Sequence, residues 1–288
     1  MKVAHAPEEL EPAERAVAIG TFDGVHRGHR AVIEAAKATG LRSLVVTFHP
    51  HPRSVLGYEV NLLATLERRI ELIERVGPDE LLIVAFTPEL SRLAPDEFVR
   101  DMLEPLGTRV VVAGEGFRFG SGRRGDLALL RRLGLEVRAV PLVEGVSSSR
   151  IRELLAEGEV ADAAHLLGRP PELEGTVVAG DQRGGTLGFP TANLAVEPGL
   201  LVPAHGIYAG AALGHRAAIS IGVNPHYGGR ERKVEAYLLD FAGDLYGARL
   251  RLELWTRLRD ERAFASEAEL VAQMSRDIEA ARTAQPPE

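Results

Sequence analysis

The stretch AIGTFDGVHRGHRAVIEAAKATG, residues 18–40, decides the fold of the N-terminal half of this chain. An apolar segment runs into a turn punctuated by Gly20, Gly24 and Gly28, which let the backbone turn sharply and approach a ligand closely. A helical pattern follows, and the start of a helix attracts anions through its N–H groups and its dipole. His26 and His29 lie at that start and can donate hydrogen bonds to phosphate oxygens. The stretch therefore predicts a site for a nucleoside triphosphate.

Short apolar runs alternate with amphipathic segments up to about residue 160. We expect strands at 15–20, 42–49, 80–86, 109–114 and 136–143, and helices at 29–40, 65–77, 94–107 and 125–134. Strict alternation of this kind predicts a parallel sheet with helices on both faces. Ligands bind such sheets beyond the carboxyl ends of the strands, where the glycine-rich turn falls.

The second half has a different texture, and Pro170 and Pro171 mark the change. Strands are expected at 174–180, 206–213, 215–223, 232–241 and 248–258. Their spacing by glycine turns predicts an antiparallel barrel or sandwich. Ser266 and Glu269 fit a capping box that opens a final helix over 266–282. The fold class is thus α/β plus β, with domains at 1–168 and 169–288.

Composition limits the classes of function. The chain has 288 residues, of which 45% are hydrophobic and 26% charged, and a net charge of −7. The acidic balance argues against a nucleic-acid surface, and no apolar run is long enough for a membrane span. The absence of cysteine excludes disulfides, thiolate zinc sites and a catalytic thiol. The acidic N-terminus does not resemble a secretory signal, so we expect a cytoplasmic protein with small-molecule partners; the oligomeric state stays open.

Three other interpretations of the first half are weaker. His26, His29, His49 and His51 with Asp23 could form a metal site, but their spacing is not that of known zinc motifs. GSGRRG at 120–125 matches a dinucleotide-binding pattern but follows a late strand and carries two arginines. Class I tRNA synthetases share HxGH, yet the chain has no convincing KMSKS partner.

The second half contains the stretch GDQRGGTLGFPTANL, residues 180–194. It lacks the Walker A pattern, but a glycine-rich loop can still form a nest of N–H groups for phosphates. Thr191 and Asn193 fall on one face of the extended segment after Pro190 and offer two neutral oxygens to a cation. Mg²⁺ accepts a few protein oxygens together with phosphates and water.

A carboxylate lies in apolar company in the stretch RKVEAYLLDF, residues 232–241. Alternation puts Glu235 on one face with Tyr237, Leu239 and Phe241. Partial burial would suit Glu235 to take a proton from a hydroxyl. A surface ion pair with Lys233 or Arg232 is the other interpretation.

These motifs together resemble the family of prokaryotic bifunctional riboflavin kinase/FMN adenylyltransferases, or FAD synthetases. Beside GTFDGVHRGH, the resemblance is carried by TFHPHP (47–52), GEGFRFG (114–120), VSSSRIR (146–152), PTAN (190–193), IGVNP (221–225) and LDFAGDLYG (239–247). It spans essentially the whole chain. It implies a Rossmann-like HxGH nucleotidyltransferase domain with a parallel sheet, then a C-terminal antiparallel β-barrel with a terminal helix that borders the flavin site.

The resemblance also implies roles for individual residues. ATP in the adenylyltransferase would be held by Gly20, Thr21, Phe22, Asp23, His26, Gly28, His29, Ser147, Ser148, Ser149 and Arg152, with the two histidines catalytic. FMN would be held by His49, Pro50, Pro52, Phe117, Arg118 and Phe119. In the kinase, ATP and riboflavin would contact Gly180, Gly184, Leu187, Gly188, Phe189, Pro190 and Asn224. Thr191 and Asn193 would bind Mg²⁺, and Glu235 would be the base.

The implied activity is phosphorylation of riboflavin to FMN and transfer of AMP from ATP to FMN, giving FAD and pyrophosphate. Four positions depart from the family pattern: Gly116, Ser149, Gly185 and His226. They put affinity or rate in doubt more than the type of reaction. Two other functions stay open: an enzyme in which one domain is inactive, and a non-catalytic regulator that binds flavin or nucleotide.

Overall fold

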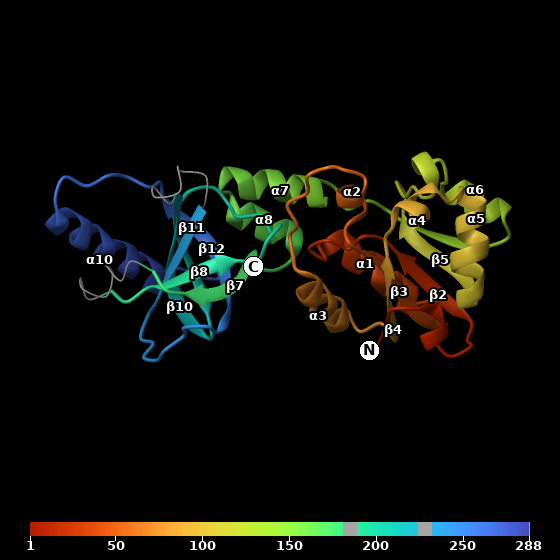
Figure 1. Ribbon diagram of the computed structural model, residues 1–288, viewed down its shortest axis with the longest axis horizontal. Helices are drawn as coiled ribbons and strands as arrows, with labels where there is room; N and C mark the ends of the chain where they lie inside the picture. Colours follow the sequence, from red (N-terminus) through yellow and green to blue (C-terminus); the bar gives the residue numbers. More distant parts are fainter. Residues whose placement is uncertain (181–188, 224–231, 288) are drawn as a thin grey trace. The chain divides into compact units, whose positions relative to one another are not determined.

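The computed structural model describes residues 1–180, 189–223 and 232–287. The chain forms two compact units, each with its own core (Figure 1). Unit 1 comprises Met1–Val60 and Leu66–Ser147, and unit 2 comprises Asn61–Thr65 and Ser148–Glu288. Within the described ranges, no helix combines the length and the apolar character that crossing a membrane requires.

Unit 1 is built on a six-stranded parallel sheet in the order β1-β4-β3-β2-β5-β6. The strands are β1 (Lys2–Ala4), β2 (Arg15–Ile19), β3 (Arg42–His49), β4 (Glu80–Ala85), β5 (Thr108–Gly114) and β6 (Glu136–Val140). The parallel sheet confirms the prediction. The prediction omitted β1, because three residues are too few to show a period.

Helices cover both faces of this sheet (Figure 1). Ala16 and Ala18 of β2 face one core, with α1 (Arg27–Lys37) and α3 (Leu66–Val76). Val17 and Ile19 face the other, with α5 (Pro95–Phe98) and α6 (Leu127–Arg132). A central strand buried on both sides must be apolar throughout, as RAVAI nearly is. The remaining short helices are η1 (Pro7–Glu9), α2 (Pro52–Val55), α4 (Pro88–Arg92) and η4 (Ser121–Arg123).

One predicted helix is not continuous. The single helix expected at 94–107 is divided into α5, a π-helical segment η2 (Val99–Leu103) and a 3-10 turn η3 (Glu104–Leu106). Pro105 has no N–H to continue an α-helical ladder, which accounts for the change of winding. Gly107 then ends the segment with a left-handed φ of 66°.

Unit 2 contains a closed six-stranded barrel in the order β10-β11-β8-β7-β12-β9. Its strands are β7 (Glu172–Val178), β8 (Ala192–Val196), β9 (Gly206–Ala212), β10 (His215–Val223), β11 (Arg232–Leu238) and β12 (Arg249–Arg259). All six strand pairs are antiparallel, so the barrel rather than the sandwich is confirmed. Closure leaves no open sheet edge.

Three segments that precede the barrel in sequence belong to its unit. Helices α7 (Ser148–Glu157) and α8 (Val160–Leu167) share the barrel core. Residues 61–65, which we call the strap, also belong here: Leu62 pairs with Leu200, and the Thr65 hydroxyl donates to Glu174 at 2.6 Å. The two compact units therefore meet between Ser147 and Ser148 in the sequence. The predicted boundary between the two functional domains, at 168/169, stays a prediction.

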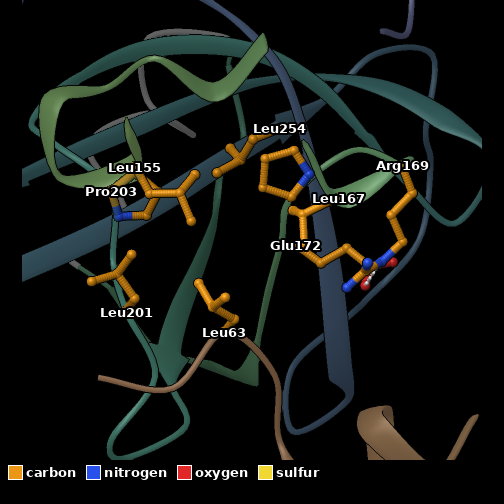
Figure 2. A pocket seen from close by; sticks show the side chains of 9 residues that line it. Leu63, Leu155, Leu167, Arg169, Glu172, Leu201, Pro203 and Leu254 are labelled. Atoms are coloured by element: carbon orange, nitrogen blue, oxygen red, sulfur yellow. Dashed lines mark ion pairs between the residues drawn. The ribbon is translucent and has the colours of Figure 1, made fainter. Parts of the chain in front are cut away.

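A small pocket lies where the strap meets the barrel (Figure 2). Leu63 of the strap, Leu155, Leu201 and Leu254 are among its apolar lining residues. An ion pair between Arg169 and Glu172, 3.7 Å apart, borders it. Leucines from separate segments converge here, so we interpret the pocket as part of the packing that fastens the strap.

The final helix, α10 (Glu267–Thr283), begins after Ser266, whose hydroxyl accepts the Glu269 N–H at 3.3 Å. The Glu269 carboxylate reaches back one residue further than the expected box, to the N–H of Ala265. An ion pair joins Arg259 of the barrel to Asp277 of the helix at 2.7 Å. The helix is therefore held at the barrel by polar contacts as well as by apolar packing.

Candidate functional site

Three of the predicted loops lie at one edge of the parallel sheet. The turn at 20–29 follows β2, the histidine–proline segment 49–52 follows β3, and residues 115–120 follow β5. These strands are neighbours in the order β3-β2-β5, so their carboxyl ends open on the same edge. The strand order also reverses beside β2, which is the switch point where such sheets bind ligands.

The turn after β2 has a strained backbone. Phe22 and Val25 have positive φ angles of 50° and 41°, and Gly24 lies between them at 79°. A β-branched residue in this region is uncommon, and each such residue costs about 1–3 kcal/mol. Phe22 and Val25 are both buried in the core with α1, which holds them in place. Strain maintained by packing is typical of a ligand-binding loop.

The two histidines of the turn are stacked at the start of α1. The His26 Nδ1 atom accepts the His29 backbone N–H at 3.2 Å, so His26 is the N-cap. This bond requires an unprotonated Nδ1, which leaves the proton of a neutral His26 on Nε2. The two ring centroids are 3.5 Å apart with an interplanar angle of 14°. A Cβ at Gly28 would lie 3.3 Å from the His26 ring, so glycine leaves room for this arrangement.

The carbonyl of Thr21 is fixed by two donors. The Thr47 hydroxyl donates to it at 3.0 Å and Arg69 Nη1 at 2.8 Å. Arg69 is only 5% exposed, and the nearby Asp23 is 1% exposed. Burial lowers the pKa of Arg69, and the negative charge of Asp23 opposes that shift. Arg69 was not among the predicted site residues, although an arginine on the apolar stripe of the helix expected at 65–77 is a signal for such a role.

The segment after β3 carries the residues that the resemblance assigns to FMN. His49 is exposed, and its pKa is lowered by partial burial and by the charge of Arg69, against the effect of Glu67. His51 is the N-cap of α2: its Nδ1 accepts the Arg53 N–H at 3.2 Å. Pro50 is exposed, whereas Pro52 is half-buried as the first residue of that helix.

The segment after β5 joins a core residue to an exposed one. Phe119 is buried and stacks with Phe117, their ring centroids 5.7 Å apart. Arg118 between them is exposed and pairs with Asp126 at 3.1 Å. Gly116 is exposed, and a Cβ there would meet no atom within 4 Å.

The other interpretations of unit 1 gain no support. In GSGRRG, Gly125 pairs with Phe119, and a Cβ at Gly125 would lie 2.7 Å from that ring. The glycine thus serves packing. Among the residues that the structure describes, no group of three or more acidic, histidine or cysteine side chains could hold a metal ion.

The serine-rich segment is divided between the units. Ser147 is the last residue of unit 1, while Ser148, Ser149 and Arg152 lie in α7 of unit 2. Arg152 Nε donates to the carbonyl of Asn61 in the strap at 2.7 Å. Their predicted role in binding the triphosphate stays a prediction.

In the barrel, the predicted metal ligand and the predicted base are direct neighbours. Asn193 of β8 and Glu235 of β11 are register partners across an antiparallel pair. Paired side chains of this kind lie about 4.5–5.5 Å apart at Cβ. This register could not be predicted from local patterns, because residues 192–196 and 232–238 are far apart along the chain.

Asn193 offers a buried acceptor atom. It is 9% exposed, and its Oδ1 atom makes no hydrogen bond within the described part of the chain. Such an atom carries a desolvation cost unless a ligand satisfies it. A Cβ at Gly180 would lie 2.1 Å from Asn193 Nδ2, so only glycine allows the backbone to lie there. Thr191 directly precedes β8 and is half-buried. This donor set fits a hard cation such as Mg²⁺.

Glu235 lies on the outer face of the barrel, because Val234 and Ala236 point to its core. Its carboxylate is 31% exposed and pairs with Lys233 at 3.1 Å, so the ion pair that the sequence left open is present. Tyr237, on the same face, makes an edge contact with the ring of Phe189, which adjoins Pro190. The predicted residues Gly184, Leu187, Gly188 and Asn224, and the departures Gly185 and His226, lie outside the described residues.

Comparisons with known proteins place both halves of the chain beside known families. A FAD synthetase family model matches residues 8–152, and a riboflavin kinase family model matches residues 167–285. The bifunctional riboflavin kinase/FMN adenylyltransferase of Listeria monocytogenes is 36% identical over 94% of this chain and 92% of its own. The Bacillus subtilis protein of the same name is 36% identical over 96% of each chain. The crystal structure of a macrolide-efflux protein from Streptococcus pneumoniae superimposes with a TM-score of 0.89 at 30% identity, covering 98% of this chain and 99% of that one.

Proposed function

This chain belongs to the bifunctional riboflavin kinase/FMN adenylyltransferase family, and we propose that the residues described above divide its two reactions between the two halves of the chain. The protein is an enzyme of FAD biosynthesis that forms FMN from riboflavin and FAD from FMN. A catalytically inactive regulator or an enzyme with one inactive domain is not favoured, since both family models match and the relatives are bifunctional.

For the kinase, the observation that carries the proposal is the pairing of Asn193 with Glu235. A base and a metal ligand side by side suit transfer of a phosphoryl group to a hydroxyl. We assign to Glu235 the role of accepting the proton of the riboflavin 5′-hydroxyl. The hydroxyl oxygen bonds to the γ-phosphorus of ATP, and ADP leaves. Thr191 and Asn193 would hold Mg²⁺, which when bound neutralises charge on the phosphates.

For the adenylyltransferase, the turn at 20–29 supports the proposal. A phosphate oxygen of FMN attacks the α-phosphorus of ATP, and pyrophosphate leaves. The attacking group is already anionic, so no general base is needed. His26, His29 and the N–H groups at the start of α1 would stabilise the charge of the triphosphate. The segments after β3 and β5, with His49 and Phe117, would hold FMN.

The division of labour would follow the predicted domains, 1–168 for adenylyl transfer and 169–288 for the kinase. We propose the cytoplasm as the compartment, because both steps consume ATP. The net charge of −7 supports small molecules rather than nucleic acid as partners.

Two substitutions test these assignments. Glu235→Gln keeps the shape of the side chain but removes its basicity, and His29→Ala removes a predicted phosphate contact. We expect the first variant to lose FMN formation and to keep FAD formation from supplied FMN, and the second to do the reverse. Each variant serves as the folding control for the other. Normal FMN formation by Glu235→Gln would refute the kinase assignment.

A further inference from the structure

The side chain of Arg69 is buried at the edge of the sheet that carries the nucleotide turn. It is 5% exposed on helix α3, and arginine is almost never so buried without a specific partner. Its Nη1 atom donates to the carbonyl of Thr21 at 2.8 Å. Its Nε atom is buried and makes no hydrogen bond among the residues described. The cost of burying this cation calls for a role beyond helix packing.

The contact at Thr21 acts on the first residues of the turn. A carbonyl oxygen has two lone pairs, and here Thr47 and Arg69 occupy both. The peptide that follows leads directly into the left-handed residues Phe22 and Val25. Holding this carbonyl in place therefore determines where the strained part of the turn begins. The neutral hydroxyl of Thr47 supplies one of the two hydrogen bonds, and the charged guanidinium of Arg69 supplies the other.

The charge of Arg69 also acts on the segment after β3. The pKa of His49 is lowered by partial burial and by the positive charge of Arg69, and the negative charge of Glu67 opposes this shift. Asp23, buried in the turn, raises the pKa of Arg69 through its negative charge, against the lowering by burial. Arg69 is thus electrostatically coupled to the turn after β2 and to the segment after β3, the two loops assigned to ATP and FMN.

We propose that Arg69 is a positioning residue for FMN adenylylation, which holds the Thr21 carbonyl and with it the turn that binds ATP. This inference rests on the proposed role of residues 20–29. Arg69 is buried beneath the turn, and it acts through Thr21 rather than by touching substrate.

The test compares Arg69→Met, Arg69→Lys and a matched control, Arg68→Met. Arg68 is the adjacent residue on α3, is buried to a similar degree, and pairs with Glu71 at 2.6 Å instead. Steady-state kcat and KM are measured for FMN to FAD and, on the same samples, for riboflavin to FMN. We expect Arg69→Met to lower kcat/KM for FAD formation by about 10- to 100-fold, as misplacement of a binding loop does. Riboflavin phosphorylation should change less than about twofold, since α3 lies outside the barrel unit.

Two further readouts separate positioning from general destabilisation. Arg69→Lys keeps the charge and an ammonium group that can donate to the Thr21 carbonyl, so it should recover most of the lost kcat/KM. In Arg69→Met the pKa of His49, followed by NMR, should rise, because a neighbouring positive charge is gone. If Arg69→Met leaves FAD formation unchanged, or if Arg68→Met reduces it equally, the inference is wrong. If instead the assignment of residues 20–29 to ATP binding is wrong, His29→Ala will also keep full FAD formation, so the two failures can be told apart.

Discussion

Replacing Gly180 with alanine should slow riboflavin phosphorylation by about 100-fold and leave FAD formation from FMN intact. The added Cβ would lie 2.1 Å from Nδ2, 2.3 Å from Cγ and 2.5 Å from Oδ1 of Asn193. Ordinary contacts begin at 3.4 Å, and Asn193 is a buried residue of a barrel strand. The methyl group must therefore displace the Asn193 side chain by about 1 Å or more, and a shift of that size at a reacting site costs about 100-fold in rate.

The assay measures both half-reactions on one preparation, by chromatography with fluorescence detection of the flavins. A suitable control is Gly214→Ala, in the turn between β9 and β10, where a Cβ meets nothing within 4 Å but φ is +82°. Because alanine is strained in this left-handed conformation, that variant should lose about 1–2 kcal/mol of stability and no activity. Kinase activity of Gly180→Ala equal to that of the parent would show that Asn193 is not a ligand whose position matters.

Three other perturbations have definite expected outcomes. Thr65→Val removes a hydrogen bond to the buried Glu174, so it should lower the free energy of unfolding by about 1–3 kcal/mol in thermal denaturation; no change in Tm would mean that the strap is not fastened there. Ser43 donates through its N–H and its hydroxyl to Asp79, which lowers the pKa of Asp79 below its ordinary value of 3.8. The stability that results is complete above pH 3.8 and is lost as the pH falls through the lowered pKa of Asp79. The free energy of unfolding of Ser43→Ala should therefore depend less steeply on pH over that range. An unchanged acid-unfolding profile would refute this. Gly28→Ala places a methyl group 3.3 Å from the His26 ring that caps α1. FAD formation should therefore fall several-fold, which corresponds to about 1 kcal/mol in activation free energy, while FMN formation stays constant. Equal loss in both assays would indicate misfolding instead.

Local patterns in the sequence were sufficient for much of the fold. Alternation of apolar runs and amphipathic segments predicts the parallel sheet, because both faces of RAVAI and its neighbours must be buried. The positions of the loops at 20–29, 49–52 and 115–120 follow from that sheet, since each comes directly after a strand. The resemblance to a known family supplied the residue roles that pattern alone left open.

What the sequence could not predict depends on contacts between distant residues. The register that pairs Asn193 with Glu235 is set by barrel closure, and the strap at 61–65 joins unit 2 through Leu200 and Glu174, far along the chain. Arg69 shows the same limit: its place in the helix was predictable, but its hydrogen bond to Thr21, 48 residues away, was not.

Both activities are tested most directly by one time course with the intact chain, riboflavin, ATP and Mg²⁺, in which riboflavin, FMN and FAD are separated and quantified. We expect FMN to appear first and FAD to follow, with ATP consumed at each step. Accumulation of FMN without FAD would contradict the assignment of the turn at 20–29 to adenylyl transfer. Unreacted riboflavin, with supplied FMN still converted to FAD, would contradict the assignment of Asn193 and Glu235 to the kinase.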